Sequence, residues 1–332
     1  MKALALISGG LDSTLATKIV QDLGIELIAF NTVSPFCLCN HRSAQGCFHG
    51  AGAVARDLNL RMIVVNVAEE MIEIVKKPPH GYGSNMNPCI DCRILLFKKA
   101  KEAMERESAA FVITGEVVGQ RPMSQKVHTM KHIEREADLE GFVVRPLSAK
   151  VLEPTIPEER GWIMREKLLD ISGRGRAPQI ALAKELGIND YPCPSGGCLL
   201  TDPSFSRRLR DQLQYGALAA REVQLLKIGR HCRLTSTCKL IVGRNEDENK
   251  RLLELAVPGD FVFEPKELPG PTGLVCGTLD QGLMRRAAGV IARYTAKDAQ
   301  AVLVVSREIP SGIEEIISAT GTSEDDLKRV IV

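Results

Sequence analysis

The chain has 332 residues, of which 44% are hydrophobic and 25% are charged, as in an ordinary globular protein. This length exceeds what one hydrophobic core usually serves, so we expect two or three domains. The net charge of +2 is too small to mark the whole chain as a nucleic-acid-binding protein, although it allows a local basic patch. Aromatic residues make up only 4%, which argues against a broad platform for stacking bases.

The ten cysteines belong to a chain whose first residues already form a predicted strand. We therefore expect no secretory signal peptide, and no apolar run reaches the roughly 20 residues of a membrane span. These features predict a cytoplasmic protein without membrane contact, in which thiols stay reduced. Cysteines there are more often metal ligands or catalytic groups than disulfide partners.

The first functional signal is a glycine-containing turn near the N-terminus, Ser8-Gly9-Gly10-Leu11-Asp12-Ser13. Residues 2–7 before it have the pattern of a buried parallel strand, and residues 14–20 after it read as a helix. Paired glycines let the backbone approach a ligand, while the serine hydroxyls and the helix N-terminus offer hydrogen-bond donors. The turn therefore predicts a site for a phosphate chain; the alternative is a tight turn with a capping serine and no ligand.

No lysine of the Walker type follows these glycines, so the turn is not the common P-loop. The order Ser-Gly-Gly-Leu-Asp-Ser after a strand resembles the PP-loop of the ATP pyrophosphatases, which cleave ATP to AMP and pyrophosphate. The resemblance implies that this loop binds the pyrophosphate of ATP. It also implies that Asp12 helps to hold Mg²⁺, because a carboxylate beside phosphates is the usual magnesium arrangement.

Further strands are predicted at 25–31, 61–67, 110–114 and 142–147, and helices at 44–60 and from Asn87 onward. This alternation predicts an α/β fold, a doubly wound parallel sheet with helices on both faces. Ligands of such sheets bind beyond the carboxyl ends of the strands. Three features are expected at those ends: the loop at Ser8, then Asn31, and Thr114-Gly115-Glu116.

Pro154 and Pro157 mark the end of this first domain. We divide the chain into a PP-loop ATP-binding domain (1–150), a connecting segment (151–215) and a smaller C-terminal α+β domain (216–332). The connecting segment is expected to hold helices at 161–171 and 180–186. For the last domain we expect the following elements: a strand pair within 232–242, an asparagine-capped helix at 245–256, and strands at 261–264, 273–276 and 301–306, with a helix between the last two.

A second functional signal is the pair Cys89 and Cys92 at a predicted helix start, together with Cys198. A CxxC pair at a helix N-terminus is expected to have lowered thiol pKa values. Three cysteine ligands and one open position suit a 4Fe–4S cluster, which we favour. The alternatives are a persulfide relay through the same cysteines, with Cys193 replacing or assisting Cys198, and buried cysteines that are only structural.

The segment Pro88-Cys89-Ile90-Asp91-Cys92, followed later by Gly-Gly-Cys, is similar to the tRNA thiouridine synthetases. Thr114-Gly115-Glu116-Val117-Val118-Gly119-Gln120 resembles a motif of the 4-thiouridine-forming tRNA sulfurtransferases, and the Cys89/Cys198 pairing looks like that of the tRNA 2-thiouridylases. The resemblance implies catalytic roles for four residues: Asp12, Cys89, Cys92 and Cys198. It implies nucleotide contacts for Asn31, Thr114, Gly115 and Gln120 in addition to the loop.

The 4-thiouridine enzymes usually carry an N-terminal RNA-binding extension, so we expect this chain to bind RNA through another part. Residues 239–249, followed by Pro269-Gly270-Pro271, resemble the RNA-binding domain of the NFACT proteins; a structural hairpin-to-helix turn is the alternative. Arginines can also fork onto phosphates, and the candidates for this are Arg174, Arg176, Arg207, Arg208 and Arg210. The alternative for these is a solvated face.

The remaining cysteines fall into two groups. Three cysteines and a histidine lie close together in the sequence and predict a structural Zn²⁺ site, with spacing tighter than in common zinc fingers: Cys37, Cys39, Cys47 and His49. The others lie on predicted strands of the last domain and are expected in its core: Cys232, Cys238 and Cys276.

Together these features predict an ATP-dependent tRNA sulfurtransferase that adenylates a uridine carbonyl and replaces its oxygen with sulfur. Its expected partners are tRNA and a sulfur donor, either sulfide or a persulfide carrier, and a homodimer is compatible with the sequence. One alternative is a PP-loop ligase that adenylates a small carboxylate and adds ammonia. The other is a non-catalytic RNA-binding protein that keeps the nucleotide fold as a sensor.

Overall fold

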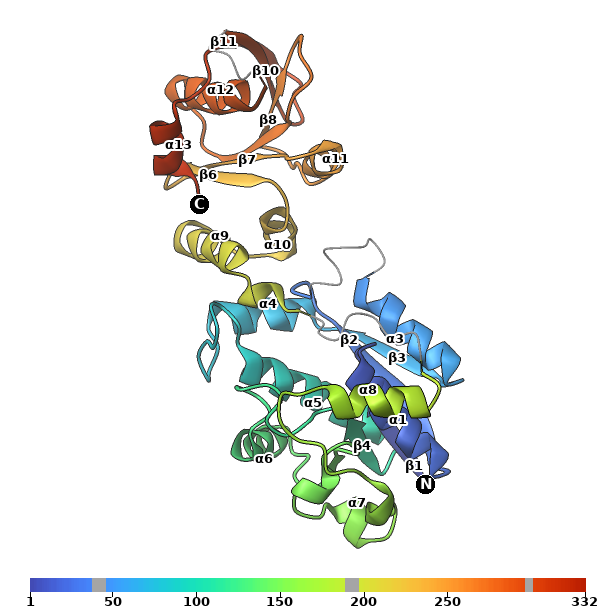
Figure 1. Cartoon of the computed structure of the whole chain (residues 1–332). Coiled ribbons are helices and arrows are strands. Elements are labelled where there is room, and N and C mark those ends of the chain that lie inside the picture. Colours follow the sequence, from blue (N-terminus) through green and yellow to red (C-terminus); the bar gives the residue numbers. More distant parts are fainter. Residues whose placement is uncertain (38–45, 189–196, 296–300) are drawn as a thin grey trace. The chain divides into compact units, whose positions relative to one another are not determined.

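The computed structural model describes residues 1–37, 46–188, 197–295 and 301–332 (Figure 1). The chain divides into two compact units, Met1–Asp202 and Pro203–Val332. This boundary falls inside the predicted connecting segment 151–215, and the three-part division stays a prediction. Within the described residues, no helix is long and apolar enough to cross a membrane.

The first unit is built on a parallel five-stranded sheet with the order β3-β2-β1-β4-β5. Its strands are β1 (Lys2–Leu6), β2 (Glu26–Val33), β3 (Met62–Asn66), β4 (Phe111–Thr114) and β5 (Val143–Val144). The chain runs from β1 to β2 on one side and returns to β4 on the other, so the strand order reverses beside β1. Ligands of such sheets bind where the order reverses, at the carboxyl ends of β1 and β4. The predicted doubly wound α/β sheet is confirmed.

Helices cover both faces of this sheet, because apolar side chains alternate between two separate hydrophobic clusters. On one face α1 (Leu11–Asp22) and α3 (Gly46–Asp57) pack beside Ala3 and Ala5. On the other, α5 (Cys89–Arg106) and α6 (Val127–Glu136) pack beside Leu4 and Leu6. The other helices of this unit are α4 (Ala68–Lys76), α7 (Ile156–Glu159), α8 (Ala177–Glu185) and the short 3-10 turns η1 (Ala149–Val151), η2 (Arg165–Lys167) and η3 (Leu199–Thr201).

The helix predicted at 161–171 is wrong. Gly161 has a φ of +66°, which ends the preceding turn, and only Arg165–Lys167 form a 3-10 turn. The backbone N–H groups of Leu169 and Ile171 instead donate to the carbonyls of Pro146 and Leu147, each at 2.8 Å. These bonds to a distant segment replace the local bonds of a helix. The accepting residues, Pro146 and Leu147, lie just after β5, which is shorter than the predicted strand at 142–147.

The second unit contains an antiparallel six-stranded sheet with the order β11-β10-β8-β9-β7-β6, which confirms a separate, smaller α+β domain. Its strands are β6 (Arg230–Thr235), β7 (Cys238–Val242), β8 (Phe261–Pro265), β9 (Gly273–Gly277), β10 (Val302–Glu308) and β11 (Glu314–Ala319). Its helices are α9 (Pro203–Tyr215), α10 (Ala220–Leu226), α11 (Glu246–Glu254), α12 (Gln281–Thr295) and α13 (Glu324–Val330). Asn245 caps α11 by accepting a hydrogen bond from the Glu248 N–H at 2.9 Å, as predicted.

Candidate active site

The glycine turn joins the end of β1 at Leu6 to the start of α1 at Leu11. Gly9 has a φ of +77°, and a Cβ at this position would lie 2.6 Å from the carbonyl carbon of Gly50, so the turn requires glycine. Gly10 is the N-cap of α1 and has no side chain that could cover the first N–H groups of the helix. The backbone is therefore open for an anion to approach the positive end of α1.

The two serines of the turn have different roles. Ser13 is buried, and its hydroxyl donates to the Gly10 carbonyl at 2.9 Å, which holds the turn in shape. Ser8 is exposed, and its Oγ lies 3.2 Å from the Oγ of Ser13. Ser8 is thus the hydroxyl that a phosphate could reach, whereas Ser13 supports the backbone.

Asp12 lies in the first turn of α1 with an incomplete set of partners. Gln120 Nε2 donates to its Oδ2 at 3.2 Å, and Arg176 lies 3.8 Å from the same oxygen. Burial raises the pKa of Asp12, and the Gln120 hydrogen bond and the Arg176 charge only partly oppose this. Within the described residues, several buried polar atoms here have no hydrogen-bond partner: Asp12 Oδ1, one terminal nitrogen of Arg176 and both amide atoms of Gln179. Such atoms are rare in folded proteins and indicate a site that a polar ligand completes.

The motif that follows β4 is pressed against this site. Thr114 is the last residue of β4, and a Cβ at Gly115 would lie 2.4 Å from the backbone nitrogen of Ser13. Only glycine allows this contact, so the loop after β4 closes one side of the phosphate turn. Asn31 lies on the other side, where its Nδ2 donates to the Ile7 carbonyl at 2.6 Å. β2 continues to Val33, so the expectation that Asn31 ends its strand is wrong by two residues.

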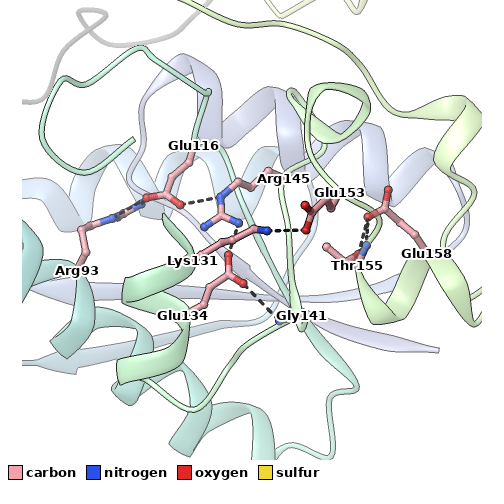
Figure 2. Close-up of polar contacts among 9 residues, drawn as sticks. All are labelled: Arg93, Glu116, Lys131, Glu134, Gly141, Arg145, Glu153, Thr155 and Glu158. Atoms are coloured by element: carbon pink, nitrogen blue, oxygen red, sulfur yellow. Dashed lines mark hydrogen bonds and ion pairs between the residues drawn. The ribbon is translucent and has the colours of Figure 1, made fainter. Parts of the chain in front are cut away.

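Glu116 lies at the start of the loop after β4 and is held there by a buried network of charged side chains, shown in Figure 2. It accepts hydrogen bonds from Arg93 Nε at 2.9 Å and from Arg145 Nε at 3.1 Å, and Arg145 also pairs with Glu134. Burial alone would raise the pKa of Glu116, but the two arginines outweigh it and the pKa is lowered. Because Arg93 follows Cys92 in α5, this network connects the loop to the helix that carries the cysteines.

The three predicted sulfur residues lie near one another. Cys89 and Cys92 occupy the first turn of α5, and the Cys198 thiol contacts the Asn87 Oδ1 just before that helix at 3.9 Å. Burial, followed by the proximity of Cys198 and Cys89, raises the pKa of Cys92 to about 12. Burial likewise raises the pKa of Cys198. The expectation of a lowered thiol pKa is therefore wrong for Cys92, where burial and the neighbouring thiols raise it.

The donors at the cysteine site are three free thiols, the ligand type of iron–sulfur clusters. Among the described residues, no three His, Cys, Asp or Glu side chains converge closely enough to hold one metal ion. A cubane instead binds each thiolate through a different iron, so its ligands surround a volume rather than a point. Thiols that repel one another as thiolates are also suited to cationic irons, which displace their protons on binding.

The backbone around Cys198 is anchored to the segment that follows β2 in the same unit. Leu199 N donates to the Phe36 carbonyl at 2.9 Å, and Cys198 forms a β-bridge with Cys37. This bridge places part of the predicted zinc group beside the sulfur site. The remainder of that group cannot be placed, because Cys39 and the side chains of Cys47 and His49 lie outside the described residues, as does Cys193. The zinc site therefore stays a prediction.

Sequence reasoning missed a histidine pair beside the cysteines. His80 Nδ1 shares a hydrogen bond with the buried Asp91 at 2.7 Å, and His132 Nε2 shares one with His80 Nε2 at 2.9 Å. Asp91 also accepts from the His80 backbone N–H at 3.2 Å, so the pair fixes the first turn of α5. The only signal in the sequence was an aspartate inside the CxxC pair. Gln179 was missed as well, and nothing in its local sequence marks it.

Two family models match the chain, one in each unit. Residues 1–152 match the model described as Thiamine biosynthesis protein (ThiI). Residues 229–331 match the NFACT protein RNA binding domain. These matches confirm both resemblances found in the sequence, that of the first unit to the PP-loop thiouridine synthetases and that of the second unit to the NFACT domain.

A probable tRNA sulfurtransferase from Lysinibacillus sphaericus (strain C3-41) is 29% identical over 124 residues, which cover 36% of this chain. The match spans only 28% of that relative's length. A 4-thiouridine synthetase–RNA complex with bound ATP is 23% identical with a TM-score of 0.40, covering 68% of this chain and 52% of that one. The U34-tRNA thiolase NcsA from Methanococcus maripaludis, with its [4Fe-4S] cluster, is 16% identical with a TM-score of 0.34, covering 68% and 72%. Structural likenesses this distant carry no argument about function.

Proposed function

We propose that the chain is an ATP-dependent tRNA sulfurtransferase. The observation that carries the proposal is the presence of two incomplete sites in one unit. The phosphate turn has buried polar atoms without partners within the described residues, and three thiols lie near one another at the start of α5. The loop after β4 contacts the first site through Gly115 and is tied to α5 through Glu116 and Arg93. The arrangement suits a reaction that brings a nucleotide and sulfur to one substrate atom.

The reaction has two steps. A carbonyl oxygen of the target uridine attacks the α-phosphorus of ATP, the bond to the β-phosphate breaks, and pyrophosphate leaves. Sulfur then attacks the activated carbon, the carbon–oxygen bond breaks, and AMP leaves with the former carbonyl oxygen. The chain's own contribution is to bind the phosphates at Ser8–Gly10 and the N-terminus of α1, and to align them with the base. A base that reaches this site must leave its stack.

Asp12 is the residue that would hold Mg²⁺. Its unpaired Oδ1 and its raised pKa both fit a carboxylate whose charge is to be balanced by a cation. Cys89, Cys92 and Cys198 would hold the 4Fe–4S cluster, which, when bound, supplies a position for sulfide.

The second unit would supply the contact with tRNA. Its match to the NFACT protein RNA binding domain covers 229–331, which includes all elements from β6 to α13. The ligase alternative leaves the cysteines without a role, although three of them lie near one another in the same unit as the phosphate turn. The sensor alternative likewise leaves the thiols unexplained.

The test combines anaerobically purified protein with ATP, Mg²⁺, tRNA and sulfide, and measures AMP, pyrophosphate and modified nucleosides by mass spectrometry. We expect one AMP and one pyrophosphate for each thiouridine formed. AMP formation that depends on a small carboxylate and ammonia, without thiouridine, would support the ligase instead. Absence of any AMP in the presence of tRNA and sulfide would contradict the proposal.

A further inference from the structure

Arg121 directly follows the motif that contacts the phosphate turn, and it has no assigned role. It lies in the loop between β4 and α6, whose conformation is fixed by hydrogen bonds around Gln125. Arg121 N donates to Gln125 Oε1 at 2.9 Å, Gln125 N donates to the Arg121 carbonyl at 3.1 Å, and Gly119 N donates to the Gln125 carbonyl at 2.7 Å. The backbone of Arg121 is thus held in place, while its side chain is exposed.

On one side, this loop contacts the phosphate site. Gln120, the residue before Arg121, donates a hydrogen bond to Asp12 at 3.2 Å. The positive charge of Arg121 also acts on Asp12, where it opposes the effect of burial on the pKa of that carboxyl. Arg121 therefore lies within electrostatic reach of the place where the phosphates of ATP are expected.

On the other side, the same loop contacts the segment that leads to the cysteines. Met123 covers Gly83 so closely that a Cβ there would lie 1.7 Å from the Met123 sulfur. Gly83 N donates to the Asn87 carbonyl at 2.9 Å, and Asn87 contacts the Cys198 thiol.

Two other arginines near these sites are held by carboxylates. Arg93 acts on Cys92, but its guanidinium is engaged by the buried Glu116. Arg176 is paired with Asp12 at 3.8 Å. Arg121 differs from both, because its exposed side chain stands on a fixed loop. This loop contacts the nucleotide site through Gln120 and the segment that leads to the cysteines through Met123.

We propose that Arg121 is a catalytic residue that binds the α-phosphate of the nucleotide in both steps of the proposed reaction. In the first step, the electron pair of the breaking phosphorus–oxygen bond leaves with pyrophosphate. In the second, hydrosulfide forms the carbon–sulfur bond, the carbon–oxygen electron pair passes to the phosphate of AMP, and the sulfur-bound proton is released to solvent. A guanidinium fork beside the α-phosphate neutralises the charge that grows on its oxygens as AMP leaves. This inference rests on the proposed function.

The test compares Arg121→Gln and Arg121→Lys with Lys126→Gln, which removes one positive charge from the exposed N-cap of the following helix. For Arg121→Gln we expect the kcat for thiouridine formation to fall about 100-fold, the typical effect of losing one preorganised charge-stabilising donor. The KM for ATP and the melting temperature should change little, and more AMP should form per thiouridine as water competes with sulfur. Arg121→Lys should recover part of the rate, because it keeps the charge but loses the fork. Lys126→Gln should behave like the parent.

A kcat for Arg121→Gln within about threefold of the parent would overturn the role of Arg121. So would a loss of activity matched by an equal loss in Lys126→Gln, since that would be a general effect of charge on RNA binding. Failure of the proposed function can be told apart from failure of the Arg121 role, because in the first case the parent protein itself would form no thiouridine. In that case RNA-dependent AMP formation by the same variants still decides whether Arg121 acts at the α-phosphate.

Discussion

The carboxylates of Glu116, which is buried, and Asp12, which is half-buried, have pKa values shifted in opposite directions, although both lie beside arginines. Glu116 is 3% exposed and accepts hydrogen bonds from two arginines, so its pKa is lowered. Asp12 has one hydrogen bond from a neutral amide and a more distant arginine, so burial dominates and its pKa is raised. The comparison indicates that a buried charge with a complete set of partners stabilises the fold, whereas one with an incomplete set is prepared for a ligand.

Substitution of Asp12, the carboxylate with an incomplete set of partners, should reduce activity more than any other change considered below. Asp12→Asn keeps the shape of the side chain but removes the charge that would hold Mg²⁺, so AMP formation should fall at least about 1,000-fold. The same substitution should raise the melting temperature of the ligand-free protein slightly, because it removes a charge that burial destabilises. Asp22→Asn, at the other end of α1, is the control, since Asp22 is exposed and, within the part of the chain that the structure describes, pairs with Lys18. Equal activity of the two variants would contradict the role assigned to Asp12.

The cysteines extend the comparison to thiols. Cys92 and Cys276 both have a pKa raised to about 12, mainly by burial, but neighbouring thiols contribute only at Cys92. Anaerobically purified parent protein should contain about four irons per chain, as expected for a cysteine-ligated cubane. Cys92→Ser should lose this iron and the thiolation activity, whereas Cys276→Ser should keep both. Iron analysis and the visible absorption spectrum measure the difference. An iron-free parent protein that still thiolates tRNA would exclude the cluster and support the persulfide relay instead.

Substitution of Glu116, the carboxylate with a complete set of partners, should lower the free energy of unfolding. Glu116→Gln leaves the buried Arg145 without one of its two carboxylates, so the free energy of unfolding should fall by about 3–5 kcal/mol. Glu153→Gln is the matched control of Figure 2, because Glu153 pairs with Lys131 at the surface and should change stability by less than about 0.5 kcal/mol. Trp162, the one tryptophan of the chain, stacks on Phe111 of the sheet and reports unfolding of this unit by fluorescence. Equal stabilities of the two variants would mean that the network in Figure 2 does not stabilise the unit.

The smallest expected effect is a pH dependence of the stability that Glu116 contributes. Because the pKa of Glu116 is lower in the folded state than its ordinary value of 4.5, its contribution to stability is present above that value. It is lost as the pH falls through the folded pKa. The difference in unfolding free energy between the parent and Glu116→Gln should therefore be constant near neutral pH and shrink under acid conditions. A difference that grows on acidification would have the wrong sign.

The sequence was sufficient for features that depend on local pattern. The glycines at 9 and 10, the alternation of strands and helices, and the CxxC pair at the start of α5 follow from residue type and spacing. The contacts that complete the site depend on tertiary structure instead. Glu116 meets Arg145 across 29 positions of the chain, and Gln120 meets Asp12 across 108. No local pattern predicts such pairs.

The wrong prediction of a helix at 161–171 and the wrong prediction of a low pKa for Cys92 have the same cause. Residues 161–171 have a helix-like pattern, yet Leu169 and Ile171 bond to a neighbouring segment because their side chains and backbone are satisfied there. The pKa of Cys92 was expected to be low from its position in the helix, but burial and the thiols of Cys198 and Cys89 raise it. In both cases tertiary packing overrides a local preference.

The proposed reaction requires a uridine carbonyl oxygen to attack the α-phosphorus of ATP at this site. A tRNA whose target uridine carries oxygen-18 at its carbonyl, used under conditions that give a single turnover, follows that oxygen. The label should appear in the phosphate of AMP, with one labelled AMP for each thiouridine. Unlabelled AMP, or label retained in the RNA after thiouridine has formed, would contradict it.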